Sequence, residues 1–125
     1  MSFQLALPEY TDPDFYSQLA AQVAALLAGE SDEVANAANL SSLLFNGLPD
    51  INWAGFYFLR ESQLVLGPFQ GLPACVRIKV GQGVCGTAAQ SGLTQLVPDV
   101  HAFAGHIACD AASRSEVVVP LFRDG

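Results

Sequence analysis

The sequence predicts an α+β fold in which helices come first and an antiparallel sheet follows. Apolar residues recur every three or four positions as far as residue 47, which is typical of amphipathic helices. From residue 50 onward, short β-branched and aromatic stretches are separated by glycine and proline, which indicates strands. The chain has 125 residues and is 51% hydrophobic, so we expect one domain over residues 1–125.

Composition limits the classes of partner. Five basic against twelve acidic residues give a net charge of −7, which disfavours nucleic acid and anionic membrane surfaces. No apolar run approaches the ~20 residues that cross a bilayer, and the start lacks a basic leader followed by an apolar stretch. We therefore expect a cytoplasmic protein. Three cysteines disfavour a structural disulfide framework and favour catalytic, redox or metal-binding thiols.

Two helices are expected in the first part of the chain. Thr11 and the acidic residues after it begin the first helix, which runs to about Ala28. Ser31 caps the second helix, which ends at Asn46-Gly47. The apolar stripes of both helices are expected to pack against the sheet.

Residues 51–59 predict a central strand, because aromatic and aliphatic residues occupy both of its alternating faces. Trp53 and Tyr57 share one face, with only Gly55 between them on that face. The two rings thus bound a shallow space, which is more often ordinary core than the wall of an apolar pocket.

The next segments are predicted as a short partner strand at residues 63–66, a loop at residues 67–73 and another strand at residues 74–80. Cys75 lies on the polar face of the last strand, together with Arg77 and Lys79. Neighbouring positive charge favours a thiolate, which makes Cys75 a candidate redox thiol.

Cys85 is predicted near the N-terminus of a short helix over residues 87–90, where the helix dipole also favours a thiolate. The glycines around it match the dinucleotide spacing, but no long βαβ unit follows and we disfavour that function. Further strands are expected at residues 94–97 and 116–122, and Asp124-Gly125 then gives a hairpin signal.

The segment from His101 to Glu116 contains both histidines, one cysteine and two carboxylates. One interpretation is a zinc site formed by His101, His106 and Cys109, although a fourth ligand would have to come from elsewhere. A second is that Cys109 is a buried small apolar residue. A third is a redox enzyme, in which a Cys109 thiolate attacks an electrophile and a second cysteine resolves the product as a disulfide.

Several segments of the sequence resemble the free methionine-(R)-sulfoxide reductases, which have a GAF-type fold. The resemblance covers most of the chain from Asn52 onward, and all three cysteines lie inside matching segments. The matching segments are Asn52-Trp-Ala-Gly-Phe-Tyr57, Leu66-Gly-Pro-Phe-Gln-Gly71, Ala74-Cys-Val-Arg-Ile78, Gly83-Val-Cys-Gly-Thr-Ala88, Asp99-Val-His-Ala-Phe103, Gly105-His-Ile-Ala-Cys-Asp-Ala-Ala-Ser113 and Ser115-Glu-Val-Val-Val-Pro-Leu121.

The resemblance implies a GAF-like antiparallel sheet of about five to six strands, with the N-terminal helices on one face. It also implies a set of functional residues. Cys109 would be the attacking thiol, Cys75 the main resolving thiol and Cys85 an auxiliary thiol. The substrate would be free methionine sulfoxide and the reductant thioredoxin, with no cofactor or metal.

The resemblance further implies that Trp53 packs on the methyl group of the substrate and that Glu116 binds the polar end of the sulfoxide. Tyr57, on the same strand face as Trp53, completes the predicted substrate-binding set. Members of that family continue past the final hairpin into another strand, so we expect the domain to be incomplete at its C-terminus. An inactive GAF-type module that only binds a small ligand stays the alternative, and a homodimer that completes the sheet stays open.

Overall fold

The computed structural model describes residues 7–103 and 114–123 of the chain. It divides into two compact units. The first unit comprises residues 1–56 and 67–71, and the second comprises residues 57–66 and 72–125. Across the described ranges, no helix is both long enough and apolar enough to cross a membrane.

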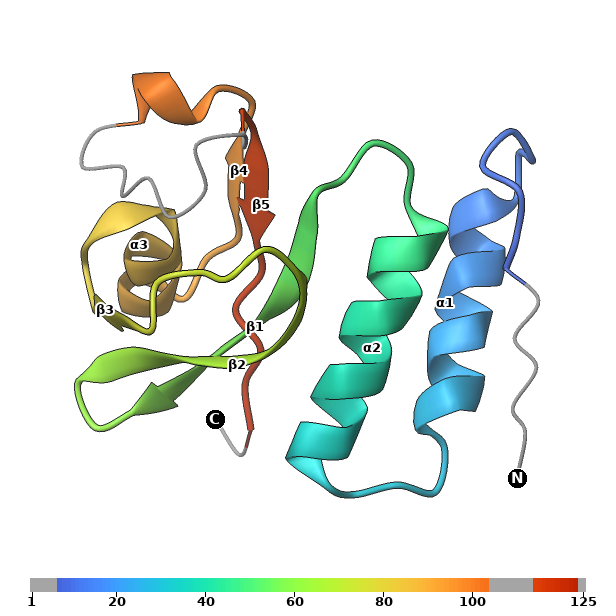
Figure 1. Ribbon diagram of the computed structural model, residues 1–125, viewed down its shortest axis with the longest axis horizontal. Coiled ribbons are helices and arrows are strands. Elements are labelled where there is room, and N and C mark those ends of the chain that lie inside the picture. Colours follow the sequence, from blue (N-terminus) through green and yellow to red (C-terminus); the bar gives the residue numbers. More distant parts are fainter. Residues whose placement is uncertain (1–6, 104–113, 124–125) are drawn as a thin grey trace. The chain divides into compact units, whose positions relative to one another are not determined.

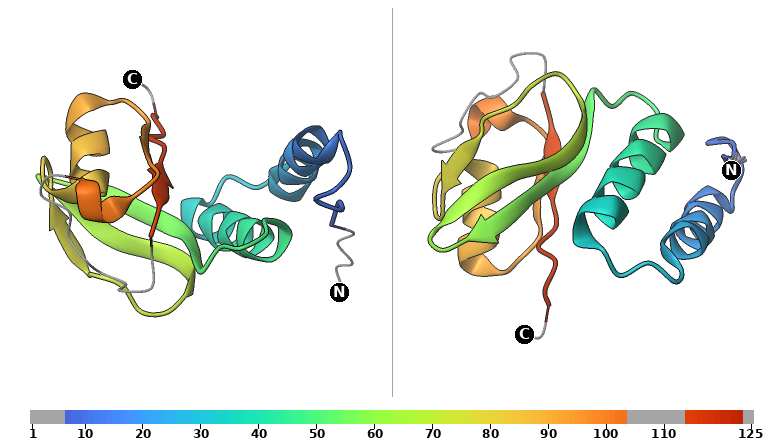
Figure 2. Two further views of the ribbon diagram at one scale, coloured as in Figure 1. Left: turned by 90° about the horizontal axis from the view of Figure 1, so that it is seen from above. Right: turned by 60° about the horizontal axis from the view of Figure 1, so that its bottom comes forward.

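The first unit contains the two predicted helices, α1 (Phe15–Leu27) and α2 (Glu33–Gly47). They lie side by side in Figures 1 and 2. Their shared core is made of Phe15, Leu19 and Leu43, each less than 10% exposed. Partly buried apolar residues surround this core, namely Val23, Leu26, Leu44 and Leu48. The apolar stripe of α1 is therefore buried as predicted, and the core that it helps to form lies between the two helices.

The start of α2 differs from the prediction by one residue. The N-cap is Asp32 rather than Ser31, because the Asp32 carboxylate accepts a hydrogen bond of 2.8 Å from the backbone N–H of Ala35. Ser31 instead donates its backbone N–H to the carboxylate of Glu30 at 3.0 Å. Both residue types are good caps, so spacing alone could not choose between them.

Strands β1 (Trp53–Arg60) and β2 (Gln63–Gly71) form a three-stranded sheet with β3 (Arg77–Lys79), in the order β1-β2-β3. The loop predicted at residues 67–73 is wrong for residues 67–71, which continue β2. Proline is tolerated at Pro68 because β3 pairs only with the residues from Gln63 to Val65. In the first unit, the hydroxyl of Ser41 on α2 donates to the Pro68 carbonyl at 3.1 Å, so α2 is tied to this half of β2.

The second unit adds helix α3 (Gly83–Ser91), strand β4 (Gln95–Val97), a 3₁₀ turn η1 (Val100–Ala102) and strand β5 (Glu116–Val118). β4 and β5 pair antiparallel, with Leu96 opposite Val117. Val84, Val97 and Val100 form one cluster of buried apolar residues in this unit. Helix α3 packs against β3, β4 and β5.

Gly86 shows why α3 begins with a glycine-rich sequence. A Cβ atom at this position would lie 2.5 Å from the carbonyl oxygen of Lys79 and 3.1 Å from the backbone nitrogen of Gly81. The helix therefore approaches the end of β3 more closely than any side chain would allow. Close backbone packing, rather than a bound dinucleotide, accounts for this glycine.

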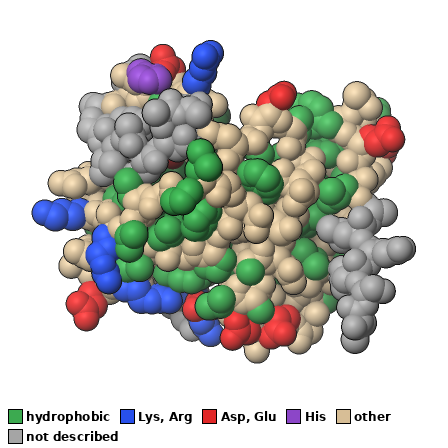
Figure 3. All heavy atoms as spheres, in the orientation of Figure 1, with side chains coloured by type: hydrophobic (Ala, Val, Ile, Leu, Met, Phe, Trp, Pro, Cys, Tyr) green, Lys and Arg blue, Asp and Glu red, His purple; other side chains and the backbone are tan. Residues whose placement is uncertain are grey.

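The α+β class is confirmed, and the described strands form a three-stranded and a two-stranded sheet rather than one sheet of five to six strands. The final strand is also shorter than predicted and ends at Val118. The prediction of one domain over residues 1–125 stays a prediction. Figure 3 shows hydrophobic side chains at the surface, and the large exposed ones on the second unit are Leu59, Leu72, Val76, Leu93, Leu96, Val117, Val119, Leu121 and Phe122.

Candidate functional site

The Trp53 side chain is closely packed against Phe69, Gly55 and Gly71 in the first unit. Its indole stacks on the Phe69 ring, with centroids 5.4 Å apart and planes 16° apart. A Cβ atom at Gly55 would collide with Cβ of Phe69 and would lie 2.8 Å from Cη2 of Trp53. A Cβ atom at Gly71, where φ is +121°, would lie 2.9 Å from Cδ1 of Trp53. The indole itself thus fills the space over Gly55, which the sequence suggested was a shallow hollow.

A hydrogen bond links Tyr57 and Cys75 in the second unit. The Tyr57 hydroxyl donates a hydrogen bond of 2.6 Å to the backbone carbonyl of Cys75. Burial, assisted by negative charge at Cys85 and Glu116, raises the pKa of Tyr57 to about 12. The hydroxyl therefore keeps its proton near neutral pH and remains a hydrogen-bond donor. Cys75 is disulfide-bonded in this structure, whereas Cys85 is a free thiol.

Cys85 is the third residue of α3, so the helix begins earlier than predicted. Burial raises the pKa of this thiol to about 11, and the negative charge of Glu116 acts in the same direction. The prediction that the helix dipole would favour a thiolate here is therefore wrong. Loss of hydration and a nearby carboxylate both penalise the anion, and they outweigh a partial positive charge at the first helical turn.

Glu116 is half-buried at the start of β5, opposite Val97 on β4. Its negative charge acts on both Cys85 and Tyr57, which places it in the same part of the second unit. An ionised carboxylate can only accept hydrogen bonds, so it can bind a protonated or N–H-bearing group of a ligand.

Four of the six predicted site residues thus come together in the second unit, namely Tyr57, Cys75, Cys85 and Glu116. Trp53 belongs to the first unit and is described there. The predicted nucleophile Cys109 and the histidine His106 lie outside the described residues. The roles assigned to all six residues stay predictions.

The zinc interpretation receives no support from the part of the chain that the structure covers. The residues that the structure describes include no group of three histidine, cysteine, aspartate or glutamate side chains placed to hold a metal ion. His101 is exposed, and its Nδ1 atom lies 3.2 Å from the carboxylate of Asp99. This pair stabilises the turn η1, whose start Asp99 also caps.

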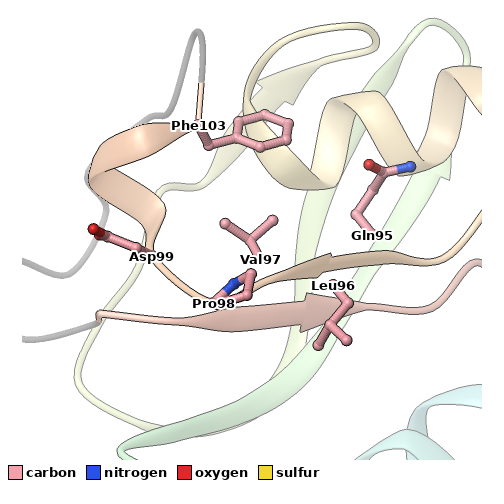
Figure 4. A pocket seen from close by; sticks show the side chains of 6 residues that line it. All are labelled: Gln95, Leu96, Val97, Pro98, Asp99 and Phe103. Atoms are coloured by element: carbon pink, nitrogen blue, oxygen red, sulfur yellow. The ribbon is translucent and has the colours of Figure 1, made fainter.

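A hollow of about 410 Å³ lies beside β4 and η1. Figure 4 shows the side chain of Val97 directed toward Phe103, while Leu96 points to the opposite side of the strand. The other lining residues are Gln95, Pro98 and Asp99. Among the predicted site residues that the structure describes, none lines the hollow, although the lining residue Val97 lies opposite Glu116 in the strand pair.

Sequence reasoning missed two structural partners of the site. Phe69 supports Trp53, but it lay in a segment that was predicted to be a loop. The hydrogen bond from Tyr57 to the Cys75 carbonyl connects residues 18 positions apart in the sequence, and no local sequence pattern predicts it. The glycines at positions 55 and 71 were the available signal, since both mark places where a bulky neighbour approaches the backbone.

Comparison with known proteins places these observations in a family, although no protein-family model matches the chain. The free methionine-R-sulfoxide reductase of Escherichia coli is 59% identical over 108 residues, covering 86% of this chain and 66% of the relative. The free methionine-R-sulfoxide reductase of Neisseria meningitidis, solved in complex with its substrate, is 43% identical with a TM-score of 0.90. That match covers 97% of this chain and 73% of the solved one.

A solved structure described as a GAF domain is 48% identical with a TM-score of 0.81, covering 86% of this chain and 65% of that one. The chain thus spans about two thirds to three quarters of the length of these three proteins. On these grounds the chain belongs to the free methionine-R-sulfoxide reductase family and has the GAF fold.

Proposed function

We propose that this chain reduces free L-methionine-(R)-sulfoxide to L-methionine, with its own cysteine thiols as the source of electrons. The observation that carries the proposal is the similarity to the Neisseria enzyme, which extends over 97% of this chain and includes a substrate complex. The grouping of Cys75, Cys85, Tyr57 and Glu116 in one unit supports it from the residues themselves.

In the first step, the thiolate of Cys109 attacks the sulfoxide sulfur, and the sulfoxide oxygen is transferred to Cys109 as the S–O bond of the substrate breaks. Methionine leaves and Cys109 becomes a sulfenic acid. In the second step, the thiolate of Cys75 attacks the sulfenic sulfur, a disulfide forms and the oxygen leaves as water. A dithiol then reduces the disulfide by exchange, and we propose thioredoxin for this role.

Cys85 is assigned the auxiliary role rather than a direct attack on the substrate. With a pKa of about 11 its sulfur stays protonated near neutral pH, which makes it a weak nucleophile. It can act after a disulfide has formed elsewhere, because exchange with that disulfide requires only a transient thiolate.

For substrate binding we propose that the Trp53 indole packs on the substrate methyl group and that Glu116 binds the polar end of the sulfoxide. The close packing of Trp53 against Phe69, Gly55 and Gly71 supports this role, since it holds the indole in one orientation. A carboxylate at Glu116 next to a sulfoxide oxygen requires a proton between them, which Glu116 can take up and deliver. No metal or organic cofactor enters the proposal, and the protein is proposed to act in the cytoplasm.

The proposal is tested by incubating the reduced protein with dithiothreitol and each epimer of free methionine sulfoxide, and by measuring methionine. We expect methionine from the R epimer only, and none from the Cys109→Ser variant. The Cys85→Ser variant is the matched control, because it removes a thiol of the same chain. Binding of the R epimer without turnover would refute the enzyme and favour a GAF-type ligand-binding module.

A further inference from the structure

Cys75 lies where the strand ladder ends. β2 pairs with β3 as far as Val65 opposite Arg77, and one more backbone hydrogen bond of 2.9 Å joins the Leu66 N–H to the Val76 carbonyl. The Cys75 carbonyl, one residue further on, accepts a 2.6 Å hydrogen bond from the Tyr57 hydroxyl. The Tyr57 side chain, which comes from β1, thus restrains the backbone at Cys75, one residue beyond the last backbone hydrogen bond to β2.

The hydroxyl of Tyr57 has only one proton to donate. That proton is directed at the Cys75 carbonyl, and the pKa of about 12 keeps it in place at neutral pH. The same hydroxyl cannot also donate to the oxygen of a bound sulfoxide. The hydrogen bond therefore indicates a structural role of the Tyr57 hydroxyl toward Cys75; packing of the Tyr57 ring on the substrate stays a prediction.

We propose that Tyr57 is a positioning residue, which holds the backbone of Cys75 so that its sulfur can reach a sulfenic acid on Cys109. This inference rests on the proposed function for the identity of the two thiols. In the resolving step, the Cys75 thiolate forms the S–S bond, the S–O bond of the sulfenic acid breaks, and the oxygen takes up a proton and leaves as water. No further oxidant or reductant is consumed.

The expected effect is a slower disulfide-forming step. Without the hydroxyl, the Cys75 carbonyl loses this tether and the sulfur samples more positions. A single hydrogen bond of this kind corresponds to a rate loss of up to about tenfold when geometry limits the reaction.

The test uses hydrogen peroxide, so that it does not depend on activity toward methionine sulfoxide. Peroxide converts the Cys109 thiolate of the reduced protein to a sulfenic acid and is itself reduced to water. Dimedone then competes with Cys75 for that sulfenic acid, and mass spectrometry gives the ratio of dimedone adduct to disulfide. The parent protein, Tyr57→Phe and the control Tyr16→Phe, an exposed tyrosine on α1, are compared.

We expect the ratio of adduct to disulfide to rise about tenfold in Tyr57→Phe and to stay at the parent value in Tyr16→Phe. An unchanged ratio in Tyr57→Phe overturns the positioning role, whatever the result with methionine sulfoxide. If Tyr57→Phe does not fold, Tyr57→His, which keeps a ring N–H donor, is compared with Tyr57→Leu. Equal ratios in that pair would likewise overturn the proposal.

Discussion

The thiol of Cys85 should behave as an unusually weak acid, and its alkylation rate measures this directly. Its pKa of about 11 lies well above the ordinary value of 9.0. At pH 7.4 the thiolate fraction is then about one in 4,000, compared with about one in 40 for an ordinary thiol. Because the thiolate is the reactive species, alkylation should be about a hundredfold slower for this reason alone.

The assay is a pH series with iodoacetamide on the fully reduced protein, in which mass spectrometry quantifies the adduct at Cys85. Burial also limits access, so the informative quantity is the shape of the pH profile rather than the rate at one pH. We expect the logarithm of the rate to rise with unit slope through at least pH 10. The protein in denaturant is the control and should level off near pH 9.

Replacement of Glu116 by Gln provides the second arm. Loss of its negative charge should lower the pKa of Cys85 and accelerate alkylation at a fixed pH, but not to the level of the denatured control, since burial is the larger cause. Between about pH 9 and pH 11, Cys85 keeps its proton in the folded chain and loses it in the unfolded chain. The free energy of unfolding should therefore fall as the pH rises through this range. A plateau near pH 9 in the native protein would refute the argument.

Two further predictions concern stability, measured by urea denaturation. Gly55→Ala should destabilise the first unit by about 1–3 kcal/mol or more, because the new Cβ meets Phe69 and the Trp53 indole; Gly47→Ala, which meets only side-chain ends of leucines, is the control, and equal stability of the two variants would contradict the packing described. Asp32→Ala should cost about 1 kcal/mol through loss of the helix cap, whereas Ser31→Ala should cost much less; the reverse order would restore Ser31 as the cap.

Local sequence patterns predicted the elements whose formation depends on local periodicity. Helices α1 and α2 and strand β1 lie where apolar spacing placed them, and Phe15 and Leu19 are buried as the stripe of α1 requires. The resemblance of the motifs to one family also predicted the GAF fold, and comparison with solved proteins confirms it.

What the sequence could not supply was the outcome of competition between distant groups. Gly67 and Pro68 favour a loop by local preference, yet β2 continues through them beyond its pairing with β3, because its other neighbour in the sheet is β1. Cys85 has a helix dipole beside it, but its acidity is set by burial and by Glu116, which is 31 positions away. The contact of Tyr57 with the Cys75 carbonyl depends in the same way on how β1 and the segment before β3 come together.

The close packing around Trp53 has a practical consequence for studying the protein in solution. The chain contains one tryptophan, so its indole fluorescence is the signal of a single side chain rather than an average. That side chain is stacked on Phe69 and closely bounded by two glycine positions of the first unit. Emission therefore reports on the first unit, while the alkylation of Cys85 reports on the second. Titrations followed by both signals can show whether the two units respond to a ligand together or separately.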